Sequence, residues 1–141
     1  VDQNLDPILV EKKIIELKKS KKNVRAIIVT DYGGQPADWV SFRKIANKYG
    51  LKVIHDSADT LGADLSGDPV GVFSDMSITS FYGSHIINCA GNGGALCLND
   101  PEVIKKAKLL RSWGRSSSLF DENSEKIENR FDIVLDNVLF G

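Results

Sequence analysis

Residues 25–56 read RAIIVTDYGGQPADWVSFRKIANKYGLKVIHD, and this stretch decides the fold. Arg25–Thr30 is rich in β-branched residues, which favours a short strand. The next segment predicts a helix that opens at Pro36-Ala37-Asp38 and ends at Gly50, because its apolar residues share one face. These residues are Trp39, Phe42, Ile45 and Ala46. With Lys52–His55 as the following strand, the stretch predicts a βαβ unit whose strands are parallel.

Four further elements are predicted around this unit. Asp6 is the expected N-cap of a helix that has Pro7 at its first position and runs to Lys19. The other three are two strands, Met76–Phe81 and Gly94–Leu98, and a helix capped by Asn99-Asp100-Pro101-Glu102 that runs to Leu110. Together these elements predict an α/β fold, with helices packed against a mostly parallel sheet.

The composition predicts a globular unit with a hydrophobic core. Hydrophobic residues make up 42% of the 141 residues and charged residues 26%, and the formal net charge is −1. The lysines of segments 11–13 and 18–22 are offset by acidic residues elsewhere, so no nucleic-acid-binding surface is expected.

The thiols and the hydropathy indicate the cellular compartment. No signal peptide is recognisable, and no apolar run is long enough to cross a bilayer, so no membrane association is expected. Cys89 and Cys97 are two isolated thiols, which are typical of a reducing cytoplasm.

Several separated motifs occur in an order that suggests one family. They are Asp31–Asp38, Val53–Ala63, Ser80–His85, Ala90–Leu96 and Leu110–Arg115. Together they resemble the DegT/DnrJ/StrS family of sugar aminotransferases, which use pyridoxal phosphate (PLP). The resemblance runs from Val1 to about Arg115, and it implies the central part of a PLP fold-type I large domain.

His85 is the residue that changes the expected reaction. Family members place a lysine five residues after the phosphate-binding serine, which here is Ser80, so that His85 stands in the lysine position. The resemblance therefore implies that the cofactor is not held covalently and binds most usefully as pyridoxamine phosphate (PMP). A smaller branch of the family carries histidine here, namely the nucleotide-sugar 3-dehydratases. Asp59-Thr60-Leu61-Gly62 is also similar to that branch.

The dehydratase branch implies a reaction and its partners. The substrate would be a nucleotide-linked 4-keto-6-deoxyhexose of deoxysugar or lipopolysaccharide biosynthesis, with His85 as the base and glutamate as the amino donor. The branch also includes enzymes with an iron–sulfur cluster on cysteines. The corresponding positions here are Ala58 and Ser116-Ser117-Ser118, so no cluster is expected.

The resemblance assigns the remaining site residues to the cofactor. Asp56, at the carboxyl end of a strand, would keep the ring nitrogen protonated, and Ala58 would pack against one ring face. Asp59 would lie beside the ring hydroxyl or position His85, and Ser80 would donate to the phosphate. Each residue also has an ordinary structural explanation: a capping aspartate, a core alanine, a strand serine and a loop histidine.

Two motifs carry no assigned chemistry. Ala90–Gly94 precedes a strand, whereas a dinucleotide-binding loop follows one, so this segment is interpreted as a structural turn. Asn92 stands where the family usually has an acidic residue, which is a departure. Trp113-Gly114-Arg115 recurs in the dehydratases as a possible interface or substrate contact.

Two alternatives remain open beside the dehydratase. One is a sugar aminotransferase that tolerates histidine at position 85. The other is a catalytically inactive fragment or assembly module, because residues 1–141 correspond to a partial large domain that lacks the N-terminal cofactor-binding segment and the C-terminal small domain. The family places its active sites at a dimer interface, so the resemblance implies a homodimer for the intact protein.

Overall fold

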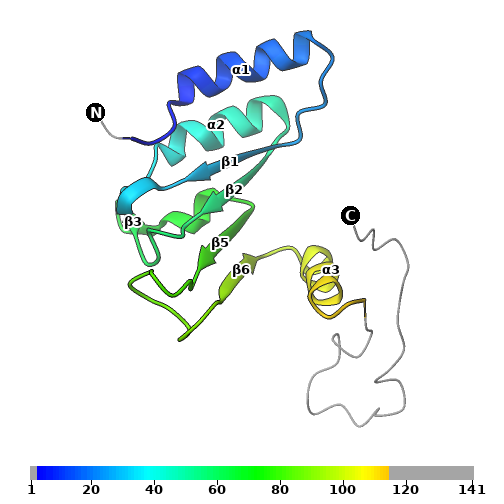
Figure 1. Cartoon of the computed structure of the whole chain (residues 1–141). Coiled ribbons are helices and arrows are strands. Elements are labelled where there is room, and N and C mark those ends of the chain that lie inside the picture. The colour runs from blue at the N-terminus through cyan, green and yellow to red at the C-terminus, as the bar shows by residue number, and fades with distance from the viewer. Residues whose placement is uncertain (1–2, 115–141) are drawn as a thin grey trace. The chain divides into compact units, whose positions relative to one another are not determined.

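The computed structural model describes residues 3–114 of the chain, which contain both helices and strands (Figure 1). In chain order the elements are α1 (Pro7–Lys19), β1 (Ala26–Thr30), η1 (Tyr32–Gly34), α2 (Trp39–Tyr49), β2 (Lys52–Asp56), β3 (Asp64–Leu65), β4 (Asp68–Pro69), η2 (Val70–Phe73), β5 (Met76–Ser80), β6 (Gly94–Leu98) and α3 (Pro101–Arg111). Of the described residues, those up to Cys97 form one compact unit, and the second unit begins at Leu98.

A four-stranded sheet has the order β1-β2-β5-β6. The first three strands are parallel, with Val29 opposite His55 and His55 opposite Ser77. Figure 1 shows β6 running in the opposite direction to β5. The expected α/β class with a mostly parallel sheet is therefore confirmed.

The core forms between α2 and one face of the sheet because strand residues alternate between the two faces. Val29 and Val53 are fully buried on the α2 side, whereas Ile28 on the opposite face is 60% exposed. The predicted apolar face of α2 lies in this core: Trp39, Phe42, Ile45 and Ala46. In addition, α1 packs against α2.

Local signals set the helix boundaries. The carboxylate of Asp6 accepts a hydrogen bond from the Ile8 N–H at the start of α1, and Asp38 does the same for Ser41 in α2. Gly50 ends α2 in the left-handed region at a φ of 65°, which a glycine adopts without strain. The predicted bounds of α1 are confirmed.

The second unit contributes α3 to the described residues. Asp100 caps this helix by accepting from Glu102, and the Gly114 N–H donates to the Leu109 carbonyl after it ends. Arg115, which completes the Trp-Gly-Arg motif, and Ser116–Ser118 lie outside the described residues. Within residues 3–114, the helices are too short or too polar to cross a membrane.

Candidate functional site

A cavity of about 520 Å³ lies beside the ends of the central strands. Four of the five predicted site residues line it, namely Ala58, Asp59, Ser80 and His85. Ala58 and Asp59 follow β2, Ser80 ends β5, and His85 belongs to the loop between β5 and β6. The fold therefore gathers residues from two segments that are separated in the sequence.

His85 lies beside a carboxylate in this cavity. Its Nδ1 atom is 3.7 Å from Oδ1 of Asp59, and its side chain is 27% exposed. The His85 N–H donates to the Tyr82 carbonyl in a turn, and the Tyr82 ring stands nearly edge-on to the imidazole at 6.3 Å between centroids. Among residues 3–114, no lysine lines the cavity.

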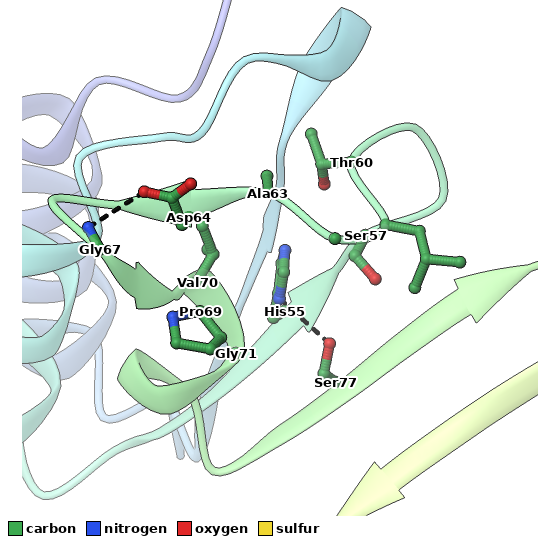
Figure 2. Close-up of a pocket in the computed structure, with 12 residues that line it drawn as sticks. His55, Ser57, Thr60, Ala63, Asp64, Gly67, Pro69, Val70, Gly71 and Ser77 are labelled. Atoms are coloured by element: carbon green, nitrogen blue, oxygen red, sulfur yellow. Dashed lines mark hydrogen bonds between the residues drawn. The ribbon is translucent and has the colours of Figure 1, made fainter.

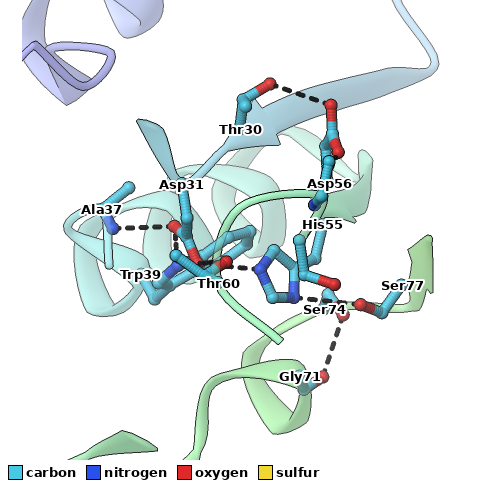
Figure 3. Close-up of polar contacts among 12 residues, drawn as sticks. Thr30, Asp31, Ala37, Trp39, His55, Asp56, Thr60, Gly71, Ser74 and Ser77 are labelled. Carbon is cyan, nitrogen blue, oxygen red and sulfur yellow. Dashed lines mark hydrogen bonds and ion pairs between the residues drawn. The ribbon is translucent and has the colours of Figure 1, made fainter. Parts of the chain in front are cut away.

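Asp56 ends β2, but it is not among the residues that line this cavity. One carboxylate oxygen accepts from the Ala58 N–H at 3.1 Å, and the other accepts from the Thr30 hydroxyl at 3.3 Å (Figure 3). The half-buried carboxylate of Asp56 thus makes the contact expected of a capping aspartate, which is the ordinary structural explanation of this residue. Its role toward a cofactor ring stays a prediction.

Ser80 is placed by its own turn. Its hydroxyl oxygen accepts from the Tyr82 N–H at 3.2 Å, which leaves the hydroxyl hydrogen available as a donor. Residues 90–92 of the predicted turn before β6 form a bend, and the Phe81 N–H donates to the carbonyl of Gly93, which follows it. A Cβ at Gly93 would lie 2.7 Å from the Cys89 sulfur, so a side chain there would require the Cys89 side chain to shift.

A buried polar cluster lies behind the site and was not predicted from the sequence. The Asp31 carboxylate is fully buried at the end of β1 (Figure 3). It accepts from the Ala37 N–H (2.8 Å), Trp39 Nε1 (2.7 Å), His55 Nε2 (2.8 Å) and the Thr60 hydroxyl (3.2 Å). The His55 Nδ1 atom contacts the Ser77 hydroxyl at 3.0 Å. With Nε2 as a donor to the carboxylate, Nδ1 of a neutral imidazole is the acceptor of the Ser77 hydroxyl.

A second cavity, of about 370 Å³, lies next to this cluster (Figure 2). His55, Thr60 and Ser77 line it together with the β3–β4 hairpin, and none of the predicted site residues does. Because His55 and Ser77 bond to each other and Thr60 bonds to Asp31, their polar groups are engaged within the protein. The second cavity therefore offers no unengaged polar group from His55, Thr60 or Ser77.

The environment of Asp31 fixes its protonation state. Burial raises the pKa of this carboxyl, but the hydrogen bonds from His55, the Ala37 N–H and Trp39 outweigh the effect and leave the pKa below its ordinary value. The charged form is thus the one that the folded protein stabilises.

Asp31→Asn is expected to lower the free energy of unfolding at pH 7 by about 2 kcal/mol, because the charge-assisted hydrogen bonds are lost. A carboxyl whose pKa is depressed by folding stabilises the protein above its unfolded pKa, which is about 3.9, and loses that contribution as the pH falls through the folded value. The difference between wild type and variant should therefore shrink below about pH 3.9. Urea unfolding at pH 7, 5 and 3 measures it, and a difference that grows toward acid pH would contradict the lowered pKa.

With the geometry established, the chain can be compared with known proteins. The model of the DegT/DnrJ/EryC1/StrS aminotransferase family matches residues 1–133. The chain belongs to this family. The family expected from the separated motifs is therefore confirmed.

Curated relatives and solved structures agree with this assignment. The chain is 33% identical over 128 residues to dTDP-3-amino-3,4,6-trideoxy-alpha-D-glucose transaminase of Streptomyces venezuelae, covering 91% of this chain and 32% of the relative. It is 36% identical to dTDP-3-amino-3,6-dideoxy-alpha-D-galactopyranose transaminase of Aneurinibacillus thermoaerophilus, covering 92% and 34%. The crystal structure of S. venezuelae DesV superposes with a TM-score of 0.71 at 32% identity, covering 87% of this chain and 30% of that chain. The chain thus spans about a third of the length of these relatives.

These comparisons confirm some expectations and leave others as proposals. The PLP fold-type I class is confirmed. The PLP or PMP cofactor is confirmed at the level of the family, since the structure of NtdA from Bacillus subtilis contains bound PMP (TM-score 0.60, 28% identity, 76% of this chain and 23% of that chain). The relatives named above are transaminases, so their names favour the aminotransferase alternative over the dehydratase. The assigned roles of the five site residues stay predictions.

Proposed function

We propose that the intact protein containing this chain is a PMP-dependent 3-dehydratase of a nucleotide-linked 4-keto-6-deoxyhexose, with His85 as the general base. The observation that carries the proposal is the composition of the first cavity. It contains an imidazole beside a carboxylate, and among residues 3–114 it has no lysine on its lining to bind the cofactor covalently.

The residues present fit a phosphorylated pyridine cofactor. The cavity volume of about 520 Å³ lies in the usual range for small-molecule sites. Ser80 offers a hydroxyl to a phosphate, Ala58 provides a small apolar wall, and Asp56 places a carboxylate at the adjacent strand end. When bound, such a cofactor supplies a primary amine and an electron-accepting ring.

His85 supplies the proton acceptor in this proposal. A neutral imidazole has a ring nitrogen that accepts a proton, so His85 is suited to take up the proton whose removal lets the sugar lose its C3 hydroxyl as water. The 3.7 Å separation between Asp59 and His85 is longer than a hydrogen bond, but catalytic contacts often shorten once the substrate is bound. Asp59 then stabilises the positive charge that His85 acquires and orients its ring.

The substrate class, amino donor, oligomeric state and location are also proposed on the basis of the family. We propose a nucleotide-linked sugar as the substrate because the relatives are named for dTDP-linked amino sugars. Glutamate as amino donor, a homodimer for the intact protein, a cytoplasmic location and the placement of residues 1–141 in the large domain are parts of the same proposal.

A sugar aminotransferase is the second candidate, and the names of the relatives favour it. In this case His85 would serve as a proton shuttle in a reaction that exchanges the keto oxygen for an amine. The two candidates use the same cavity and the same cofactor, and they differ in the product.

Product mass distinguishes the two candidates. The intact protein is incubated with PMP, glutamate and a GDP- or CDP-linked 4-keto-6-deoxy sugar, and the sugar product is weighed by mass spectrometry. A product that lacks one oxygen is expected from 3-dehydration. A product in which nitrogen replaces the keto oxygen would overturn the dehydratase proposal and establish the aminotransferase.

A further inference from the structure

The Asp31 carboxylate connects segments that surround the cofactor cavity. It accepts hydrogen bonds from the segment before α2, from β2 and from the loop after β2, through Ala37, His55 and Thr60. The Asp31 N–H also donates to the carbonyl of Asp56 at 3.2 Å. A single buried side chain thus joins the ends of two parallel strands to the loop that follows the second strand (Figure 3).

Thr60 is the member of this cluster that is nearest in sequence to the site. Its hydroxyl donates to Asp31 at 3.2 Å, and Thr60 as a whole is only 6% exposed. The Thr60 N–H donates to the Ser57 carbonyl, and the Thr60 carbonyl accepts from Ala63, so the loop is a pair of consecutive turns around Thr60. Asp59 lies immediately before Thr60 and lines the cavity.

The same loop also lies against the segment that follows Asp31. A Cβ built at Gly34 would lie 3.6 Å from the Asp59 carbonyl, so the segment after Asp31 packs against the Asp59 backbone. Small displacements of the loop would consequently move Asp59 relative to His85. The Asp59 Oδ1 and His85 Nδ1 atoms are 3.7 Å apart in the structure.

We propose that Asp31 is a positioning residue for the cofactor site, acting through the Thr60 hydroxyl to fix the loop that carries Ala58 and Asp59. The inference rests on the proposed function to the extent that it takes the cavity as the cofactor site. The coupling between Asp31 and the loop is a property of the protein without cofactor and is measured separately. A fixed supporting residue keeps the residues that contact a ligand in their productive geometry.

Asp75 provides a matched control for Asp31. Its carboxylate accepts from the Val53 N–H (2.8 Å), Arg43 Nη2 (3.0 Å) and Lys52 Nζ (3.1 Å). It directly precedes β5, so it lies at the amino end of a strand whose carboxyl end carries Ser80. Loss of this carboxylate is expected to destabilise the fold without changing the cofactor site.

The first measurement is hydrogen exchange of the protein without cofactor, under conditions where every variant is folded. In Thr60→Val, which removes the hydroxyl and keeps the shape, exchange at Ser57, Thr60 and Ala63 is expected to be about tenfold faster, because the loop opens more often. Thr60→Ser, which retains the hydroxyl, should restore the wild-type rates, and Asp75→Asn should leave them unchanged relative to global unfolding. If these amides exchange at the wild-type rates in Thr60→Val, the proposal is overturned.

The second measurement is the dissociation constant for PMP. Thr60→Val is expected to weaken binding about fivefold, with recovery in Thr60→Ser and no change in Asp75→Asn. If Asp31 acts through Thr60, adding Thr60→Val to Asp31→Asn should weaken binding by much less than fivefold. Additive effects, or faster loop exchange with unchanged PMP affinity, would overturn the positioning role. Neither outcome depends on whether the product is deoxygenated or aminated. The mass of the product tests the proposed reaction, and the loop exchange and PMP affinity test the positioning role.

Discussion

Replacing His85 with asparagine is expected to lower the turnover of the proposed dehydration by about 10²–10⁴-fold, the usual contribution of a general base. The reason is that an asparagine amide takes up no proton at neutral pH, while it keeps a polar group of similar size in the cavity. The His85 side chain is partly exposed, and its ring contact is with the exposed Tyr82, so the fold should not depend on it. Turnover is measured as product mass over time, together with a thermal melt.

His55 is the natural control because it is the other of the two histidines in the sequence. It is 3% exposed and bridges Asp31 and Ser77, so His55→Asn should lower the melting temperature markedly. His85→Asn should show the opposite pattern, with the melting temperature retained and the reaction lost. Retained dehydratase activity in folded His85→Asn would falsify the assignment of His85 as the base.

The elements predicted correctly are those with strong local signals. The βαβ stretch is explicit in the sequence because Trp39, Phe42 and Ala46 repeat at helical spacing, between two runs of β-forming residues. The β3–β4 hairpin was missed because its strands contain only two residues each. Two residues are too few to show an alternating pattern, and the turn at Ser66-Gly67 depends on two positive φ angles, 58° and 92°.

The candidate site was predictable where the resemblance supplied motifs. Ala58, Asp59, Ser80 and His85 do line one cavity, although no single segment of the sequence contains them all. The cofactor role of Asp56 stays a prediction, and the structure orients its carboxylate toward the Thr30 hydroxyl and the Ala58 N–H. The neighbouring strand decides this orientation, and a single sequence does not reveal strand order.

The support behind the site was not predictable from local patterns. Asp31 lies 24 residues from His55 and 29 from Thr60 in the sequence, so their hydrogen bonds depend on the folded sheet. A polar residue after a strand is usually exposed, so no local pattern marked Asp31 as buried. The available signal was its position, because it follows β1 as Asp56 ends β2 and the carboxyl ends of parallel strands meet at one edge.

Family similarity and reaction type are determined by different residues in this chain. The identity of 33–36% to the transaminases is an average over 128 and 129 aligned residues. The choice between transamination and dehydration depends on the group that contacts the cofactor and substrate, and the proposed group here is the His85 imidazole, which lines the first cavity. Relatives named as transaminases are therefore compatible with a different reaction at position 85, and the product decides between the two.

Replacing Asp56 with asparagine is expected to lower turnover about 10²-fold, the scale of removing one electrostatic contact from an active site. The substitution separates the two explanations of this residue. An asparagine oxygen still accepts from the Ala58 N–H, and its amide donates to the Thr30 hydroxyl, so both observed contacts are retained. Only the negative charge is lost.

Thr30→Val is the matched control because it removes the hydroxyl contact and leaves the Asp56 charge in place. If Asp56 serves the cofactor, Asp56→Asn should weaken PMP binding and turnover, while Thr30→Val changes turnover by only a few fold. Turnover, PMP affinity and melting temperature are measured for both variants. If Asp56→Asn instead matches wild type in turnover, the carboxylate is a capping group of the strand end, and the partner of the ring nitrogen must be sought elsewhere in the intact protein.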